Sequence, residues 1–555
     1  MSFFRPSKRA KSSNSTHENR DSTNISGNLE QNVDKMLRIF GENDDFVVRR
    51  IRIFGQFPAA FMNFSNLTDE QQINSDVLKS LMRQPFHKEI GDPESFRLED
   101  FLLSEVLYHE KAQVEKRFDQ IVEAILQGKS VLLADGMDAA IVIDTRRLEK
   151  RAVDQPQTEQ VIRGPREGFI EQLGTNLALL RYRLQTADFR VKTMKIGRLT
   201  KSTVAICYIK GIANPALVEE VQRRLSAIDI DGVIDAGYLE QFIEDHHLSP
   251  FPQIQNTERP DKAVSNLLEG RVIILMDGSP FALIVPSVFS QFYQSMEDYS
   301  ERFVLVSFIR FARLIALVFS LIFPSLYVAI ISFNPELIPT EFAVAVAGGR
   351  AGVPFPAVIE VLVMETTMEV LREATIRLPQ QVGGALSIVG VLVVGQAAVS
   401  AGFASPITVV IIALTTIGSF ATPAYNAALA LRLLRFPLVI LAGTFGLYGV
   451  MIGLILIANH MLSLKSFGVP YISPIVPGNF QSLKDSLVRA PLWSLRNRPA
   501  QLHTPDDTRL GETEQIHASP RNTLDPLKVG NDRWESEQDG VSTPDHNVPG
   551  GGNSH

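Results

Sequence analysis

The spacing of apolar residues divides this chain into two unlike parts. From the N-terminus to about residue 299, charged residues recur every few positions, whereas long uncharged apolar runs begin at Leu314. A soluble core does not need such runs, which are typical of membrane-spanning helices. The pattern therefore predicts a soluble module followed by a membrane module.

Within the soluble module, one order of predicted elements occurs twice. Gly55 corresponds to Gly197 and Gly136 to Gly278, each at an offset of 142 residues. Chance spacing of common glycines is the alternative, but the repeated order favours two related α/β domains in tandem. The first series has strands at 47–55 and 59–67, helices at 76–84 and 120–128, and an Asp-Gly hairpin at 131–146. The second has strands at 191–197 and 202–211, a helix at 215–228 and an Asp-Gly hairpin at 271–285.

The membrane module contains four segments with the length and composition of a span. They are 314–333, bent at Pro324, then 384–402, 406–423 and 436–459. Two further segments are ambiguous, because 354–373 carries three glutamates and prolines and glycines break 466–483. All the arginine and lysine clusters lie on the cytoplasmic side only if both ambiguous segments cross or re-enter the bilayer. The pattern favours six passes with both ends inside.

Composition completes this organisation. Residues 1–34 are rich in Ser, Asn and charge, and no apolar stretch follows their basic residues, so nothing marks the soluble module for export. Residues 500–555 contain ten acidic and four basic side chains, which accounts for most of the net charge of -7. The predicted parts are a disordered arm (1–34), a first cytoplasmic α/β domain (35–147), a linker helix with the second cytoplasmic α/β domain (148–300), a transmembrane domain (301–483) and a cytoplasmic, mostly disordered acidic tail (484–555).

Carboxylates inside a membrane segment are costly and are functional candidates for that reason. At 100° per residue, Glu365 and Glu369 share a face with Arg372 and Glu373, while Glu360 points away. In an oligomer, such a face would form acidic rings that select cations, so Glu360, Glu365 and Glu369 are the candidate ion path. The alternative is an amphipathic helix that lies at the membrane surface with its charges in water.

A charged stretch at 161–184 joins the two predicted soluble domains. It contains a Gly-Pro turn and then a helix with a leucine stripe, as expected of a linker helix packed on a neighbouring domain. An anion site at the helix start is the alternative. The candidate residues for coupling between the domains are Arg163, Arg166, Glu167 and Glu171.

Signs of enzymatic chemistry are sparse. The segment 197–203 lacks the spacing of a phosphate-binding loop, and the adjacent His246 and His247 favour a solvated helix end over a metal site. The single cysteine, Cys207, lies in an apolar segment and is interpreted as a buried hydrophobe. We therefore expect no catalytic residue, no metal and no cofactor. The charge pattern gives no basic surface for nucleic acid.

Several longer strings point to a known family. RGPREGFIEQLGTNLALLRYR (163–183), with LADGMDAAIVIDTR (133–146) and LMDGSPFALIVPSVF (275–289), resembles the A subunit of GerA-type spore germinant receptors. The membrane strings at 371–406, 429–437 and 466–477 resemble it too. The resemblance covers roughly residues 35–498, whereas the arm and the acidic tail match nothing in the core of the family.

The resemblance implies a non-enzymatic multi-pass protein of the spore inner membrane. A subunits of this family work with a transporter-like B subunit and a lipoprotein C subunit, and they convert nutrient sensing into release of ions and calcium dipicolinate. They are proposed to form an oligomeric ligand-gated cation channel, with membrane lipid around it. The alternatives are a paralogue that accompanies the dipicolinate channel, a secondary transporter, and a membrane scaffold subunit.

Overall fold

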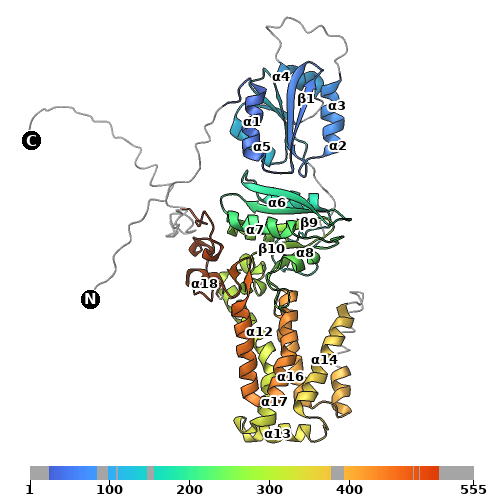
Figure 1. The fold of residues 1–555 in the computed structure, drawn as a ribbon, viewed down its shortest axis with the longest axis vertical. Coiled ribbons are helices and arrows are strands. Elements are labelled where there is room, and N and C mark those ends of the chain that lie inside the picture. The colour runs from blue at the N-terminus through green and yellow to red at the C-terminus, as the bar shows by residue number, and fades with distance from the viewer. Residues whose placement is uncertain are drawn as a thin grey trace, which may run out of the picture. The chain divides into compact units, whose positions relative to one another are not determined.

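The first sheet contains five antiparallel strands in the order β1-β2-β4-β5-β3 (Figure 1). The computed structural model describes residues 24–83, 98–107, 111–146, 155–376, 393–478, 480–486 and 488–511. The strands are β1 (Phe46–Ile53), β2 (Phe57–Phe64), β3 (Ala112–Glu115), β4 (Ser130–Ala134) and β5 (Ala140–Ile143).

Helical segments cover both faces of this sheet. One apolar cluster joins α1 and α5 to one face, and a second joins η1, α3 and η2 to the other. Because both faces are covered, every residue of β4 and β5 is buried, and all of them except Ser130 are apolar. The segments are α1 (Leu29–Phe40), α2 (Glu70–Gln72), η1 (Ile73–Leu78), α3 (Lys79–Met82), α4 (Leu98–Phe101), η2 (Leu102–Val106) and α5 (Phe118–Leu126).

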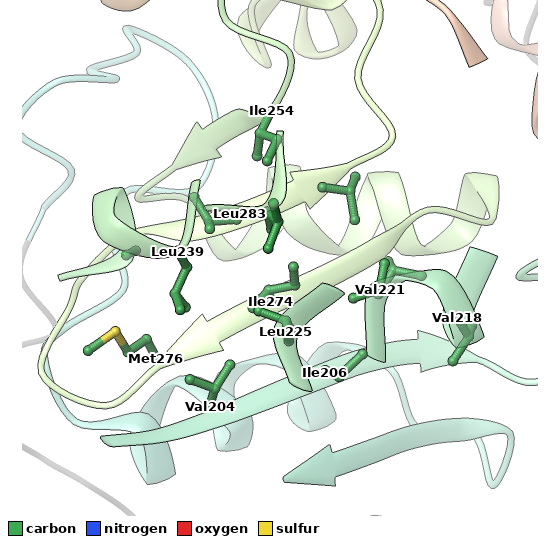
Figure 2. Packing of buried hydrophobic residues seen from close by; sticks show 14 of the residues in the cluster. Val204, Ile206, Val218, Val221, Leu225, Leu239, Ile254, Ile274, Met276 and Leu283 are labelled. Carbon is green, nitrogen blue, oxygen red and sulfur yellow. The ribbon is translucent and has the colours of Figure 1, made fainter. Parts of the chain in front are cut away.

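The second sheet repeats this arrangement, with the order β6-β7-β9-β10-β8. Helices α7 and α8 cover one face, where Val221 and Leu225 of α7 pack with Ile206 and Ile274 of the sheet (Figure 2). Helices α6 and α9 cover the other face. The elements are α6 (Leu173–Arg183), β6 (Phe189–Ile196), β7 (Ser202–Ile209), α7 (Pro215–Ser226), α8 (Ala236–Ile243), β8 (Gln255–Thr257), α9 (Pro260–Glu269), β9 (Val272–Met276) and β10 (Ala282–Val285).

The two sheets match each other position by position in their central hairpins. Strands β4 and β9 begin 142 residues apart, and so do β5 and β10. Gly136 and Gly278, between these strands, both have positive φ angles of 83° and 90°, as tight Asp-Gly turns require. The edge strands β3 and β8 are only four and three residues long, and the sequence pattern missed them both.

The short helices α10 (Phe289–Phe292) and α11 (Glu297–Ser300) end the second sheet domain, and the helical module begins with α12. Among the described residues, α12 and α17 are long and apolar enough to cross a membrane. The elements of the helical module are α12 (Phe303–Phe333), η3 (Pro335–Leu337), α13 (Thr340–Arg350), α14 (Ala357–Ile376), α16 (Pro406–Phe420) and α17 (Tyr425–Ser463). Residues 393–400 are also helical, whereas 384–392 of the predicted span 384–402 lie outside the described residues.

Helix α17 is a hairpin and not one straight rod. Gly446 has a non-helical backbone, with φ 62° and ψ -142°. A Cβ placed on Gly453 would lie 2.4 Å from Leu438 Cδ1, although these residues would be about 22 Å apart in a straight helix. The helix therefore folds back at Gly446 into a first arm, residues 425–445, and a second arm, residues 447–463. The predicted single span at 436–459 is wrong, because its apolar run conceals the glycine at which the chain reverses.

Contacts between helices show that successive helices alternate in direction. Helix α14 is antiparallel to the first arm, because Val358 packs beside Gly443 while Glu365, farther along α14, pairs with the earlier Arg435. Helix α14 thus lies within the bundle.

Helix α16 is antiparallel to α12. The hydroxyl groups of Thr408, near the start of α16, and Tyr327, near the end of α12, are 3.0 Å apart. Gly418, near the end of α16, packs against Ala316 in the first half of α12.

The far end of α12 meets the turn of α17, and both ends of α17 return to the second sheet domain. Phe333, the last residue of α12, packs against Gly446. The amide of Ala424 donates to Phe292 O at 3.2 Å, and Ser249 Oγ lies 2.9 Å from His460 Nε2.

The segment 466–483 does not form a membrane-crossing helix. It contains the short hairpin β11 (Lys465–Ser466) and β12 (Val469–Pro470), turns up to residue 478 and the beginning of α18 (Phe480–Ser486). The hydroxyl of Ser466 accepts a hydrogen bond from the amide of Ser287 at 3.0 Å, which fixes the hairpin to the end of the second sheet domain. The sequence left open whether this segment crosses or re-enters the bilayer, and its prolines and glycines produce turns instead of a crossing helix.

Ordered structure extends into both predicted tails. Helix α1 begins at Leu29, inside the predicted arm. Near the other end, Arg498 Nε donates to Leu268 O at 2.9 Å and Leu502 is buried, so the described part of the tail packs on the second sheet domain. The remaining short elements there are η4 (Leu492–Ser494) and η5 (Ala500–Leu502).

We expect Gly446→Ala to destabilise the helical module by about 1–3 kcal/mol, because its backbone conformation is strained for any residue with a Cβ. The new Cβ would also lie 3.0 Å from Phe333 Cβ. Thermal unfolding of the purified protein in detergent measures this effect. The control is Gly348→Ala, since Gly348 has open space around it. Equal melting temperatures for the two variants would contradict a reversal at Gly446.

Candidate functional site: a charged ladder between α14 and α17

Glu365 of α14 forms a buried ion pair with Arg435 of the first arm. Arg435 Nη1 lies 3.2 Å from Glu365 Oε2, and the two side chains are 2% and 8% exposed. Helical spacing places Glu365 on the face that packs against the first arm. Burial of a single charge here would be costly, so each residue depends on the other.

Glu369 lies one turn farther along the same face and contacts two arginines. Its carboxylate accepts a hydrogen bond from Arg372 Nη1 at 2.7 Å and lies 3.5 Å from Arg432 Nε. We use the name charged ladder for Glu365, Glu369, Arg372, Arg432 and Arg435. It contains three positive and two negative formal charges.

The ladder has hydrogen-bonding groups that no described residue satisfies. Arg432 and Arg435 are buried, and the Nε and Nη2 atoms of both have no hydrogen-bond partner among the described residues. Buried guanidinium groups normally satisfy most of their donors. Among the described residues, the ladder is therefore incompletely paired. Its contacts can rearrange with the loss of fewer hydrogen bonds than a fully paired cluster would lose.

Glu360 lies outside the ladder, as the helical spacing indicates. Its carboxylate accepts a hydrogen bond from the backbone amide of Ser405, the N-cap residue of α16, and lies 3.6 Å from Arg350 Nε. A negative charge at a helix N-terminus stabilises that helix. Glu360 is 1% exposed, so its charge is not in bulk water. The structure gives it a local role at the start of α16.

The four predicted coupling residues are separated along the linker. Arg163 lies 3.6 Å from Glu301, just before α12, and Glu167 pairs with Arg183 of α6. Glu171 contributes its backbone oxygen, which accepts from the Gly278 amide at 2.8 Å. Arg166 is exposed and makes no hydrogen bond or ion pair among the described residues. No single cluster joins them.

A buried contact between the two sheet domains uses Arg181 of α6 instead. Its guanidinium binds both carboxylate oxygens of Asp45 at 2.6 Å, and it also donates to Asn43 at 3.2 Å. The guanidinium lies 3.9 Å from the Phe64 ring centre. Both charged side chains are almost fully buried. The sequence contained a signal for this role, because Arg181 lies four residues after Leu177 of the leucine stripe and thus on the same side of the helix.

The loop before β1 adds further contacts to the second sheet. Asp44 accepts hydrogen bonds from the backbone and side chain of Thr193, and Glu42 pairs with Arg190 at 3.0 Å and Lys210 at 2.6 Å. The ammonium of Lys210, followed by the guanidinium of Arg190, lowers the pKa of Glu42. Glu42 is therefore held as a carboxylate.

A second buried arginine fixes the junction of the second sheet domain with α12. Arg310 is fully buried and donates to Asp298 of α11 at 2.8 Å and to the backbone oxygen of Asp485 of α18 at 2.5 Å. Arg313, one turn later, also contacts Asp298 at 3.2 Å. Arg310 and Arg313 thus connect this domain to the first helix of the bundle. Both arginines belong to the basic clusters that indicate the topology, and their burial has no local signal in the sequence.

Two minor candidates have structural explanations. Cys207 is buried in β7, and burial raises the pKa of its thiol, so it remains protonated. The ring of His246 packs edge-on against His460 of the second arm, with their centres 5.7 Å apart. Within the described ranges, no group of three His, Cys, Asp or Glu side chains could hold a metal ion.

One known protein family matches most of this chain. The family model described as "Bacillus/Clostridium GerA spore germination protein" matches residues 34–501, which include both sheet domains and the helical bundle. The chain belongs to the GerA family of spore germination proteins. The matched range covers the positions of the ladder residues and of Asp45 and Arg181.

Relatives in this family match almost from end to end. Spore germination protein KA of Bacillus subtilis (strain 168) is 40% identical over 519 residues, which cover 93% of this chain and 94% of that protein. Spore germination protein GerLA of Bacillus cereus is 39% identical, covering 87% of this chain and 97% of that protein. The crystal structure of the N-terminal domain of the A subunit of the Bacillus megaterium spore germinant receptor GerK3 is 33% identical. It covers 49% of this chain and 99% of that chain, with a TM-score of 0.38.

Proposed function

We propose that this chain is the A subunit of a nutrient-germinant receptor in the spore inner membrane, where it couples nutrient sensing to ion release. Membership of the GerA family over residues 34–501 supports the receptor assignment. The buried ladder between α14 and the first arm is the observation that carries the coupling mechanism.

The bundle is proposed to cross the membrane six times, with both ends on the side of the sheet domains. The crossings are α12, α14, the segment that ends near residue 402, α16 and the two arms of α17. Alternating helix directions and the return of both ends of α17 to the second sheet domain support this count. The first sheet domain is extended to include all of α1, from Leu29, and the predicted limits 35–147, 148–300 and 301–483 are otherwise kept. We place the sheet domains in the cytoplasm, which becomes the spore core.

The ladder is proposed to control a cation path. In the present arrangement, the arginines of the first arm neutralise Glu365 and Glu369, so the carboxylates cannot attract a cation. Separation of α14 from the first arm would expose them, and rings of such groups in a homo-oligomer would select cations. Glu360 would keep α16 in place beside that path.

Coupling to the path is proposed to pass through two contacts. The Arg181–Asp45 pair joins the two sheet domains, and Arg310 joins the second of them to α12. Arg163, through Glu301, connects the linker to the same junction. Arg166, Glu167 and Glu171 would then position the linker. A transporter-like B subunit and a lipoprotein C subunit are the proposed partners.

Spores that lack every other receptor of this family test the proposal. Deletion of the gene is expected to abolish germination by the nutrient, and the wild-type gene supplied with its B and C partners should restore it. Germination by exogenous calcium dipicolinate serves as the control and should not change. Loss of both responses would instead support a paralogue that accompanies the dipicolinate channel. An unchanged nutrient response would contradict the receptor assignment.

A further inference from the structure

The exposed residues of α12 between Phe303 and Phe319 are all apolar, including those at the end next to the second sheet domain. Val304, Leu305 and Phe308 are all exposed there, while Arg310 is fully buried and points into the protein. The helix has 31 residues, which corresponds to about 46 Å. This length matches the roughly 40–45 Å of a bilayer with its headgroups and exceeds the hydrocarbon core alone. The first turn of α12 is therefore at headgroup level.

The chain returns to this first turn near its other end. Ser307 Oγ donates to Arg489 O at 3.1 Å, and the rings of Trp493 and Phe303 pack edge-on with their centres 5.9 Å apart. Arg489 is itself buried and donates to Tyr299 O at 3.4 Å. These contacts fix residues 488–496 beside the start of α12.

Most of the apolar side chains of this segment point outward, although one side of the segment packs against the protein. Val488, Leu492 and Trp493 are 55%, 49% and 67% exposed, while Leu495 is buried. Arg496 follows them and is also exposed. An aromatic ring beside a cation, at the end of a membrane helix, is typical of the membrane–water interface.

We propose that residues 488–496 form an interfacial lipid-binding segment, with Val488, Leu492 and Trp493 among the upper acyl chains and Arg496 at an anionic headgroup. Two observations favour lipid over a second copy of the chain: the exposed apolar side chains continue those of α12 without a break, and the adjacent charge is an arginine. This inference rests on the proposed membrane location of α12.

The native tryptophans provide a direct test. The sequence has only two, Trp493 and Trp534, so Trp534→Phe leaves Trp493 as a single reporter. The full chain is reconstituted into vesicles of anionic lipid with and without bromine near the headgroup end of the acyl chains. An interfacial ring should lose fluorescence by about twofold in the brominated vesicles. Arg496→Gln should reduce this quenching in anionic vesicles and leave it unchanged in neutral ones.

A second reporter separates failure of this inference from failure of the membrane assignment. Leu456 is exposed on the second arm, so Leu456→Trp in a Trp493→Phe, Trp534→Phe background should be quenched if α17 lies in lipid. Quenching of Leu456→Trp without quenching of Trp493 would overturn the interfacial segment alone. Absence of quenching in both would overturn the membrane location as well. Trp493 that is unquenched by bromine yet shielded from acrylamide would point to a protein partner and would also overturn the proposal.

Discussion

Replacement of Arg435 by alanine is expected to destabilise the helical module by about 3–5 kcal/mol, because Glu365 would remain buried without its partner. The Glu365 side chain is only 8% exposed, so water cannot replace the guanidinium. Chemical or thermal unfolding of the purified protein in detergent measures the change. The matched control is Arg198→Ala, which removes a surface arginine that pairs with Asp229 and Asp231 and should cost less than about 1 kcal/mol.

A double variant distinguishes loss of the pair from loss of packing. Glu365→Gln combined with Arg435→Gln removes both charges and keeps side chains that can hydrogen-bond, so it should be much more stable than Arg435→Ala. The losses of unfolding free energy in the single variants Glu365→Gln and Arg435→Gln provide the comparison. If the loss in the double variant equalled their sum, Glu365 and Arg435 would not interact in the membrane.

Replacement of Arg181 by alanine is expected to abolish the nutrient response while the helical bundle still assembles. The substitution leaves Asp45 buried and unpaired, with a cost of about 3–5 kcal/mol at the contact between the sheet domains. Spore germination, with the amount of receptor measured in the same spores, gives the result. Proteolysis of the purified protein should show increased cleavage between the two sheet domains.

Arg166→Ala is the matched control for this second prediction. Arg166 lies in the same linker but is exposed, so its loss should alter neither protease resistance nor germination by a measurable amount. Equal effects of Arg166→Ala and Arg181→Ala would contradict the assignment of domain coupling to the Arg181–Asp45 pair.

Apolar alternation was sufficient to predict the long strands and the repeated order of the soluble module. Both sheets are covered on two faces, and their central strands are therefore strongly apolar. Short edge strands have no such constraint, which explains why β3 and β8 were missed. In the helical module, composition identified apolar segments but not their ends. A glycine that reverses the chain, such as Gly446, is indistinguishable in composition from the many other glycines of the bundle.

For the candidate residues too, relations within one helix could be predicted from the sequence, whereas contacts between distant segments could not. Helical spacing separated Glu360 from Glu365 and Glu369, because that relation depends on one helix. It could not supply their partners, since Arg432 and Arg435 lie more than 60 residues later and meet them only through the packing of two helices. The charged linker predicted a coupling role for Arg163 and Arg166. The arginine that joins the domains is instead a buried one, Arg181. Burial of Arg181 depends on Asp45, which lies 136 residues earlier.

Nutrient-triggered potassium release from spores that carry Glu365→Gln with Arg435→Gln tests the central claim most directly. The ladder is proposed to control the cation path, so this variant should assemble at wild-type levels and yet show release that is lost or altered in ion selectivity. Release with the wild-type rate and selectivity would show that the pair has only a structural role, and it would contradict the account.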